Sequence, residues 1–286
     1  IIAFNIGSEL ELSIIKKLGK SIFIIAFFES VCTFLLVAGV SYLVTRDIPM
    51  ALILGAVSSA TAPAATVMVL KECKAKGPLT SSLLGVVAVD DAICLMIYSV
   101  AASVARVFIN HEAITIDKVL LLPLEEIALS VIIGGLCGLV FSILLRVFNR
   151  ESEVLPFILG GLLIVNGLSV TMGLSPLLTA MSMGIMVANL AVNKNKVFKS
   201  IEAFSPPIIS AFFVLAGSRL DVAMLPQIGI LGLMYLVFRI IGKVSGASIG
   251  AKVAKAPTTV KKYIGLGLLS QVGVAVGLAI TVSREF

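Results

Sequence analysis

The sequence contains no tryptophan and a single histidine, His111, and only 13% of its 286 residues are charged. One histidine is too few for a histidine-rich metal site. No Ser/His/Asp set, P-loop or zinc motif occurs either, so we predict neither an enzyme nor a resident cofactor. The four cysteines form no CxxC pair and three lie in apolar runs, where small buried hydrophobic side chains are their common role.

The sequence is rich in apolar residues. They make up 59% of the chain, with a mean hydropathy of +1.13. A soluble domain is about 45–50% apolar and about 25% charged, so the composition predicts an all-α polytopic membrane protein. A helix that crosses the hydrocarbon needs about 20 apolar residues. By that criterion we predict nine spans, over 21–45, 48–70, 79–105, 119–145, 154–171, 174–191, 204–217, 227–251 and 263–283.

Residues 1–10 resemble the tail of one further span, and the chain opens on Ile1 without a recognisable signal peptide. We therefore expect a fragment of a longer protein. The net charge of +6 reflects topology rather than a nucleic-acid surface. Fifteen of the 22 Lys and Arg residues fall in loops on one side of the predicted spans and five on the other, which places the first side in the cytoplasm.

An internal repeat is visible at a shift of 210 residues. The segment GSELEL (7–12) aligns with GSRLDV (217–222), and the predicted spans at these places run in opposite directions. The same shift places Gly55 on Gly265, Thr61 on Gln271 and Pro63 on Gly273. An inverted-topology repeat of this kind is common in secondary transporters.

The repeat also relates two unusual spans. SSATAPAATV (58–67) carries a proline in mid-membrane, and GLGLLSQVGVAVG (265–277) is rich in glycine with two polar residues. Proline removes a helical hydrogen bond, and paired interruptions at equivalent places indicate a binding site near the midplane. We predict two crossed discontinuous helices, with the crossing at Ser59, Thr61, Pro63, Ser270 and Gln271. The alternative is a simple proline kink and glycine packing.

Five ionisable residues lie well inside the predicted spans: Glu29, Asp90, Asp91, Arg239 and Lys243. Each costs about 2.5–3.5 kcal/mol or more at the centre of a lone helix, and such residues usually mark ion or proton pathways. Asp90 and Lys243 differ in predicted depth by roughly 5 Å, so their side chains can meet. Arg239 lies at a compatible depth too, so depth does not choose between the two cations.

Asp90 and Asp91 stand together in GVVAVDDAICLMIYSVA (85–101), with no Lys or Arg within ten positions of either aspartate. Adjacent helical residues point about 100° apart, so one can pair with a cation while the other faces a cavity. A carboxylate can hold a hard cation or a proton, but not both. Exclusive occupancy combined with alternating access gives exchange. The alternative is that both aspartates only hold helices together.

Several segments carry a family resemblance: GSELEL, GAVSSATAPAATVMVLKECKAKGPLTSSLLGVVAVDDA (55–92), GLSPLLTAMSMGIMVAN (173–189), FFVLAGSRLD (212–221) and IIGKVSGA (240–247). In these the chain resembles the bacterial monovalent cation/proton antiporters of the Kef/Nap type. The resemblance implies an inverted-repeat fold of about thirteen helices, in which a core domain moves against a dimerisation domain. The chain would then lack the helices before residue 1 and the last core helix.

The resemblance also assigns domains. Residues 1–12 are the end of a dimer-side helix, 13–105 the first half of the core, 106–150 a linker helix, 151–222 dimer-side helices and 223–286 the second half of the core. It implies a homodimer in the bacterial inner membrane that exchanges Na⁺, Li⁺ or K⁺ for H⁺.

By the same resemblance, Asp91 is the essential ion- and proton-binding aspartate and the Na⁺ ligand. Asp90 is its partner and pairs with Lys243, which is itself a candidate second proton carrier. Two aspartates with this lysine favour Na⁺ and electrogenic exchange of two protons per cation. Glu29 and Arg239 lie 210 residues apart, and we expect a structural ion pair between them.

Two other transport functions compete with exchange. A Na⁺-coupled solute symporter of similar crossed-helix fold would need a cavity shaped for a substrate, and the sequence has no aromatic or arginine cluster to line one. A K⁺ channel would need a TVGYG-like filter, which is absent. We therefore favour exchange, with the cation, protons and the bilayer as the expected partners and no nucleic acid.

Overall fold

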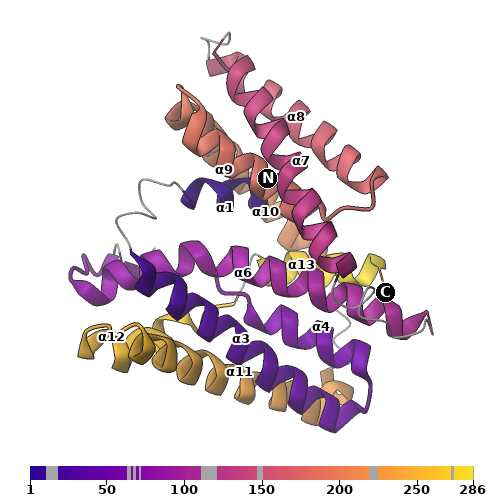
Figure 1. Cartoon of the computed structure of the whole chain (residues 1–286), viewed down its shortest axis with the longest axis vertical. Helices are drawn as coiled ribbons and strands as arrows, with labels where there is room; N and C mark the ends of the chain where they lie inside the picture. Colours follow the sequence, from indigo (N-terminus) through magenta and orange to yellow (C-terminus); the bar gives the residue numbers. More distant parts are fainter. Residues whose placement is uncertain are drawn as a thin grey trace. The chain divides into compact units, whose positions relative to one another are not determined.

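The computed structural model of the chain describes residues 1–10, 19–62, 66, 69–70, 72–110, 121–146, 151–218, 225–271 and 274–285. Throughout these described ranges the regular secondary structure is helical and contains no strand (Figure 1). The chain divides into two units, each made of two stretches of sequence. The smaller unit contains Ile1–Ile14 and Leu124–Leu220, and the larger contains Ile15–Pro123 and Asp221–Phe286.

The smaller unit is a group of helices around one apolar core. Its helices are α1 (Ile2–Glu9), α7 (Leu122–Leu144), α8 (Glu151–Thr171), α9 (Pro176–Leu190) and α10 (Lys194–Ser218). Its core includes Phe4, Ile158, Met183 and Ile201, all at most 1% exposed. Helices α1 and α9 approach closely because both carry a glycine at their contact: a Cβ added to Gly184 would lie only 3.2 Å from the Cα of Gly7.

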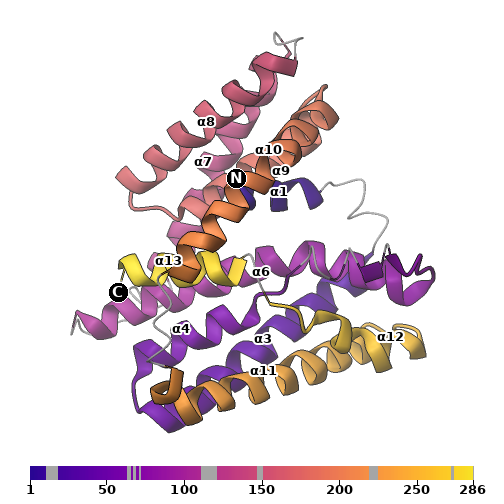
Figure 2. The same ribbon diagram turned by 180° about the vertical axis from the view of Figure 1, so that it is seen from behind.

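The larger unit contains the two halves of the repeat. Its first half contains α3 (Lys20–Thr45), α4 (Ile48–Ser59) and α6 (Pro78–Ile109). Its second half contains α11 (Leu225–Val253), α12 (Thr258–Tyr263), the 3₁₀ helix η3 (Ile264–Leu268) and α13 (Val274–Glu285). Figures 1 and 2 show α3 between α4 and α11, and α4 between α3 and α6.

The helices agree with most of the predicted spans. Among the described residues, five helices are long and apolar enough to cross a membrane, in α3, α6, α7, α8 and α11. α4, α9 and α13 are shorter apolar helices. The largest difference is α10, which begins at Lys194 rather than near 204 because it continues through a polar first turn and through Pro206 and Pro207.

The repeat is visible in the bounds of the elements. Adding 210 to α4 (48–59) gives 258–269, and α12 and η3 together cover 258–268 of this stretch. Both stretches then lose helical structure, at Ala60–Ala62 in the first half and at Leu269–Gln271 in the second. The predicted all-α fold with two discontinuous helices is therefore confirmed. The roles predicted for the segments within it stay a prediction.

Glycines on α11 bring it against α3 at backbone distance. A Cβ on Gly242 would lie 2.7 Å from Thr33 Cα, and one on Gly246 would lie 2.9 Å from Glu29 Cα. A Cβ on Gly250 would lie 2.8 Å from Ile25 Cα. As the α11 number rises by four the α3 number falls by four, so the two helices are antiparallel. Small residues at every fourth position are the usual basis of close helix packing in membranes.

This contact predicts that Gly246→Ala destabilises the protein. The new methyl group would lie 2.7 Å from the Phe28 carbonyl oxygen, and overpacking of this kind costs about 1–3 kcal/mol. Gly39→Ala is the matched control, because Gly39 lies on α3 with nothing within 4 Å of its added Cβ. Thermal unfolding in detergent should show a lower midpoint for Gly246→Ala and no loss for Gly39→Ala. Equal midpoints would contradict the close packing.

Candidate functional site

The two helix breaks meet and pair through the backbone. The Ala62 N–H donates to the Ser270 carbonyl at 2.9 Å, and the Ser270 hydroxyl donates to the Ala62 carbonyl at 3.1 Å. The predicted crossing residues Ser59, Thr61 and Ser270 all belong to this region, whereas Pro63 lies outside the described residues. Lipid offers no hydrogen bonds, so these freed backbone groups need partners inside the protein.

Polar side chains complete the crossing. The Gln271 amide donates to the Val57 carbonyl at 3.0 Å and to the Tyr235 hydroxyl at 2.9 Å. The Thr66 hydroxyl donates to the Gly267 carbonyl at 3.0 Å. The sequence analysis missed Thr66 and Tyr235 as members of the crossing. Tyr235 lies on α11 four residues before Arg239, a spacing that places both on one helix face.

Arg239 donates hydrogen bonds to backbone carbonyls at the interruptions of both helices. Its guanidinium donates to the carbonyls of Ser58 at 3.1 Å and Ala60 at 3.0 Å in the first half. It also donates to the carbonyls of Leu269 at 2.7 Å and Ser270 at 3.4 Å in the second half. The last carbonyls of a helix have no intrahelical partner and carry partial negative charge, so a cation there is favourable.

Lys243, one turn further along α11, joins the crossing to two carboxylates. Its ammonium donates to the Ser59 carbonyl and to the Thr61 hydroxyl, the latter at 2.7 Å. It forms ion pairs with Glu29 and with Asp90, whose Oδ2 is 3.4 Å from Nζ. Lys243 is fully buried, as are both acids.

Asp90 receives hydrogen bonds from two hydroxyls as well. The Ser30 hydroxyl donates to Oδ1 and the Thr61 hydroxyl to Oδ2. Ser30 was missed by the sequence analysis, because a serine on an apolar helix gives no signal of its own. Asp91 follows on α6 and is 1% exposed. The structure thus brings Asp90 and Lys243 together at the crossing, as expected, and adds Ser30 and Glu29 to them.

The expected ion pair between Glu29 and Arg239 is not the arrangement observed. Glu29 pairs with Lys243, and Arg239 is occupied by four backbone carbonyls. The packing of α3 on α11 explains the difference. Glu29 lies level with Gly246, three residues from Lys243 but seven from Arg239. At 1.5 Å per residue these are axial offsets of about 4.5 and about 10.5 Å.

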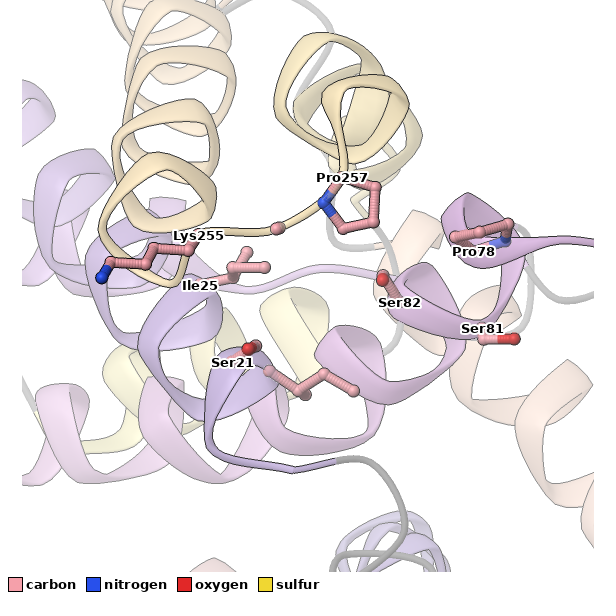
Figure 3. Close-up of a pocket in the computed structure, with 9 residues that line it drawn as sticks. Ser21, Ile25, Pro78, Ser81, Ser82, Lys255 and Pro257 are labelled. Atoms are coloured by element: carbon pink, nitrogen blue, oxygen red, sulfur yellow. The ribbon is translucent and has the colours of Figure 1, made fainter.

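A separate pocket of 310 Å³ lies where α3, α6 and α12 begin. Figure 3 shows Ser21 and Ile25 of α3, Ser82 of α6 and Pro257 around it. Lys255 also lines it. None of the predicted site residues does, so this pocket is distinct from the buried cluster.

A family model and two relatives match this chain over most of its length. The family described as "Sodium/hydrogen exchanger, transmembrane" matches residues 1–285. A Na(+)/H(+) antiporter of Enterococcus hirae is 26% identical over 278 residues, which cover 95% of this chain and 71% of that protein. The ammonium/H(+) antiporter subunit AmhT of Alkalihalophilus pseudofirmus is 23% identical over 294 residues, covering 100% of this chain and 70% of that protein.

Solved structures show the same fold. The sodium proton antiporter MjNhaP1 from Methanocaldococcus jannaschii, determined at pH 8, superposes with a TM-score of 0.78 at 19% identity. The match covers 99% of this chain and 71% of that one.

The contacts of Arg239 predict that Arg239→Gln weakens the crossing. A glutamine cannot reach all four carbonyls, and each buried acceptor left without a donor costs about 1–3 kcal/mol. Hydrogen exchange should accelerate at the Ala62 amide, and thermal unfolding in detergent should occur at a lower temperature. Lys252→Gln is the control, because it removes an exposed cation from the same helix. Unchanged exchange at Ala62 in Arg239→Gln would contradict the role of Arg239.

Proposed function

The chain belongs to the sodium/hydrogen exchanger family, and from this premise we propose that it exchanges Na⁺ for H⁺ with Asp91 as the shared binding carboxylate. Exchange of a monovalent cation for protons follows from the family and from its antiporter relatives. One observation supports the assignment of the binding site to Asp91. A buried Asp90–Lys243 ion pair stands at the crossing of two broken helices, directly beside a second buried aspartate.

The proposed mechanism uses competition at Asp91. Hard cations prefer oxygen ligands, and a carboxylate supplies them only while it is ionised. A proton on Asp91 therefore expels Na⁺, and Na⁺ expels the proton. Asp90 lies beside it, and in this structure it accepts hydrogen bonds from the hydroxyls of Ser30 and Thr61 and pairs with Lys243. Exposing this site to one side of the membrane and then to the other couples the two ion flows.

We assign transport to the larger unit, because it contains both broken helices and every residue of the buried cluster. We assign dimerisation to the smaller unit and place the protein in the bacterial inner membrane, as the resemblance of the sequence implies. A Na⁺-coupled symporter is not favoured, since the relatives are named as antiporters.

The cation is proposed to be Na⁺, which the name of the Enterococcus relative supports. The other relative is named an ammonium/H⁺ antiporter subunit, so NH₄⁺ is the second candidate. Proteoliposomes given Na⁺, Li⁺, K⁺ or NH₄⁺ in turn, with internal pH as the readout, separate these cations. We expect the highest apparent affinity for Na⁺.

Asp91→Asn should abolish Na⁺-driven proton movement in proteoliposomes, because asparagine neither binds a proton nor neutralises a cation. Asp90→Asn should leave residual exchange, since it removes only the partner. Glu202→Gln, which neutralises an exposed acid on α10, is the control and should exchange like the wild type. Normal exchange by a folded Asp91→Asn protein would refute the proposed site.

Exchange of two protons per Na⁺ moves net charge, so it should respond to voltage. With the membrane potential clamped by K⁺ and valinomycin, an interior-negative potential should drive more proton entry and Na⁺ exit. The Na⁺ gradient that balances a fixed pH gradient should shift with the imposed voltage. A balance point independent of voltage would show electroneutral exchange instead.

A further inference from the structure

Lys243 has one more carboxylate partner than the proposed mechanism uses. An ammonium group has three N–H donors. Its hydrogen bonds go to the Ser59 carbonyl, the Thr61 hydroxyl and, at 3.4 Å, the Asp90 carboxylate. Glu29 contacts the ammonium as an ion pair without a hydrogen bond, and it is the nearer of the two acids.

Asp90 depends less on Lys243 than Glu29 does. Both carboxylate oxygens of Asp90 already accept a hydrogen bond from a hydroxyl, one from Ser30 and one from Thr61. For Glu29, the ammonium is the close partner, and the Ser30 hydroxyl lies at 3.3 Å from Oε2 while it also donates to Asp90. A buried ion pair that loses one partner leaves an uncompensated charge, which is strongly destabilising.

The backbone holds Glu29 and Lys243 together. They lie on α3 and α11, which touch at backbone distance through Gly242 and Gly246. Asp90 lies on a third helix, α6, and reaches Lys243 only at its side-chain tip. The Glu29–Lys243 pair is thus built into the close contact of α3 with α11, whereas the Asp90–Lys243 pair is not.

We propose that Glu29 is the fixed counter-ion of Lys243 and holds its ammonium at the crossing when Asp90 releases it. This inference rests on the proposed exchange function. Glu29 acts through Lys243 and is a positioning residue. In consequence, Lys243 keeps its charge throughout the cycle, supports the carbonyl end of α4 at Ser59, and does not itself carry a transported proton.

Two substitutions of Glu29 separate charge from packing. Glu29→Gln keeps the volume and removes the charge, and Glu29→Asp keeps the charge and shortens the side chain. In proteoliposomes, we expect Glu29→Gln to lower the maximal rate of Na⁺-driven proton exchange by at least about tenfold, because a buried ammonium loses its nearest counter-charge. Glu29→Asp should retain more activity than Glu29→Gln. A role in packing gives the opposite order, and that order would overturn the proposal.

A stability cycle tests the same pair without transport. The variants are Glu29→Gln, Lys243→Gln and the two combined, compared by thermal unfolding in detergent. We expect the double variant to unfold at a higher temperature than Lys243→Gln alone, because it leaves no unpaired acid at position 29. The parallel cycle of Asp90→Asn with Lys243→Gln should show weaker coupling, since two hydroxyls still serve Asp90.

The outcomes remain distinguishable. A double variant no more stable than Lys243→Gln, or stronger coupling for Asp90 than for Glu29, would overturn the proposal. If a single variant cannot be purified but the double variant can, the coupling is shown directly. A wild-type protein that exchanges no cation would count against the proposed function, while the stability cycle would still report on the pair.

Discussion

Two interrupted helices in a membrane leave backbone carbonyls and amides that lipid cannot satisfy, and the arrangement of the larger unit follows from that constraint. Arg239 donates to two carbonyls from each half of the repeat, and Lys243 adds the carbonyl of Ser59. Both cations come from one face of α11. A single helix thereby supplies donors to five backbone carbonyls of the crossing.

The same constraint produces the chemistry of the site. Cations that serve carbonyl ends must themselves be balanced when they are buried, and the acids that balance Lys243 lie on two different helices. One of these acids, Asp90, stands next to Asp91 on α6. The carboxylates proposed to bind ions therefore interact electrostatically with Lys243. A change in their ionisation alters the charge around the cation that donates to the carbonyl of Ser59 at the helix break.

The breaks, the repeat and the five buried charges were predictable from the sequence, because proline, glycine and intramembrane charge are strong local signals. The family resemblance also indicated the Asp90–Lys243 pair. The partner of Glu29 was predicted wrongly, because depth alone does not separate Arg239 from Lys243. The distinction depends on the register of α3 against α11. Gly242, Gly246 and Gly250 set that register, and their four-residue spacing is visible in the sequence. Ser30 and Thr66 carried no signal, since isolated hydroxyls are common in apolar helices.

The Glu29–Lys243 pair joins two residues that are synthesised far apart in time. The two residues are 214 positions apart, so at about 5–20 residues per second the ribosome adds the lysine roughly 10–40 s after the glutamate. During that interval α3 and α6 enter the bilayer with Glu29 and Asp90 and without their cation. The first half of the larger unit is thus an unbalanced intermediate until α11 arrives. Arrival of α11 supplies the cation that pairs with both acids and forms the glycine contact with α3.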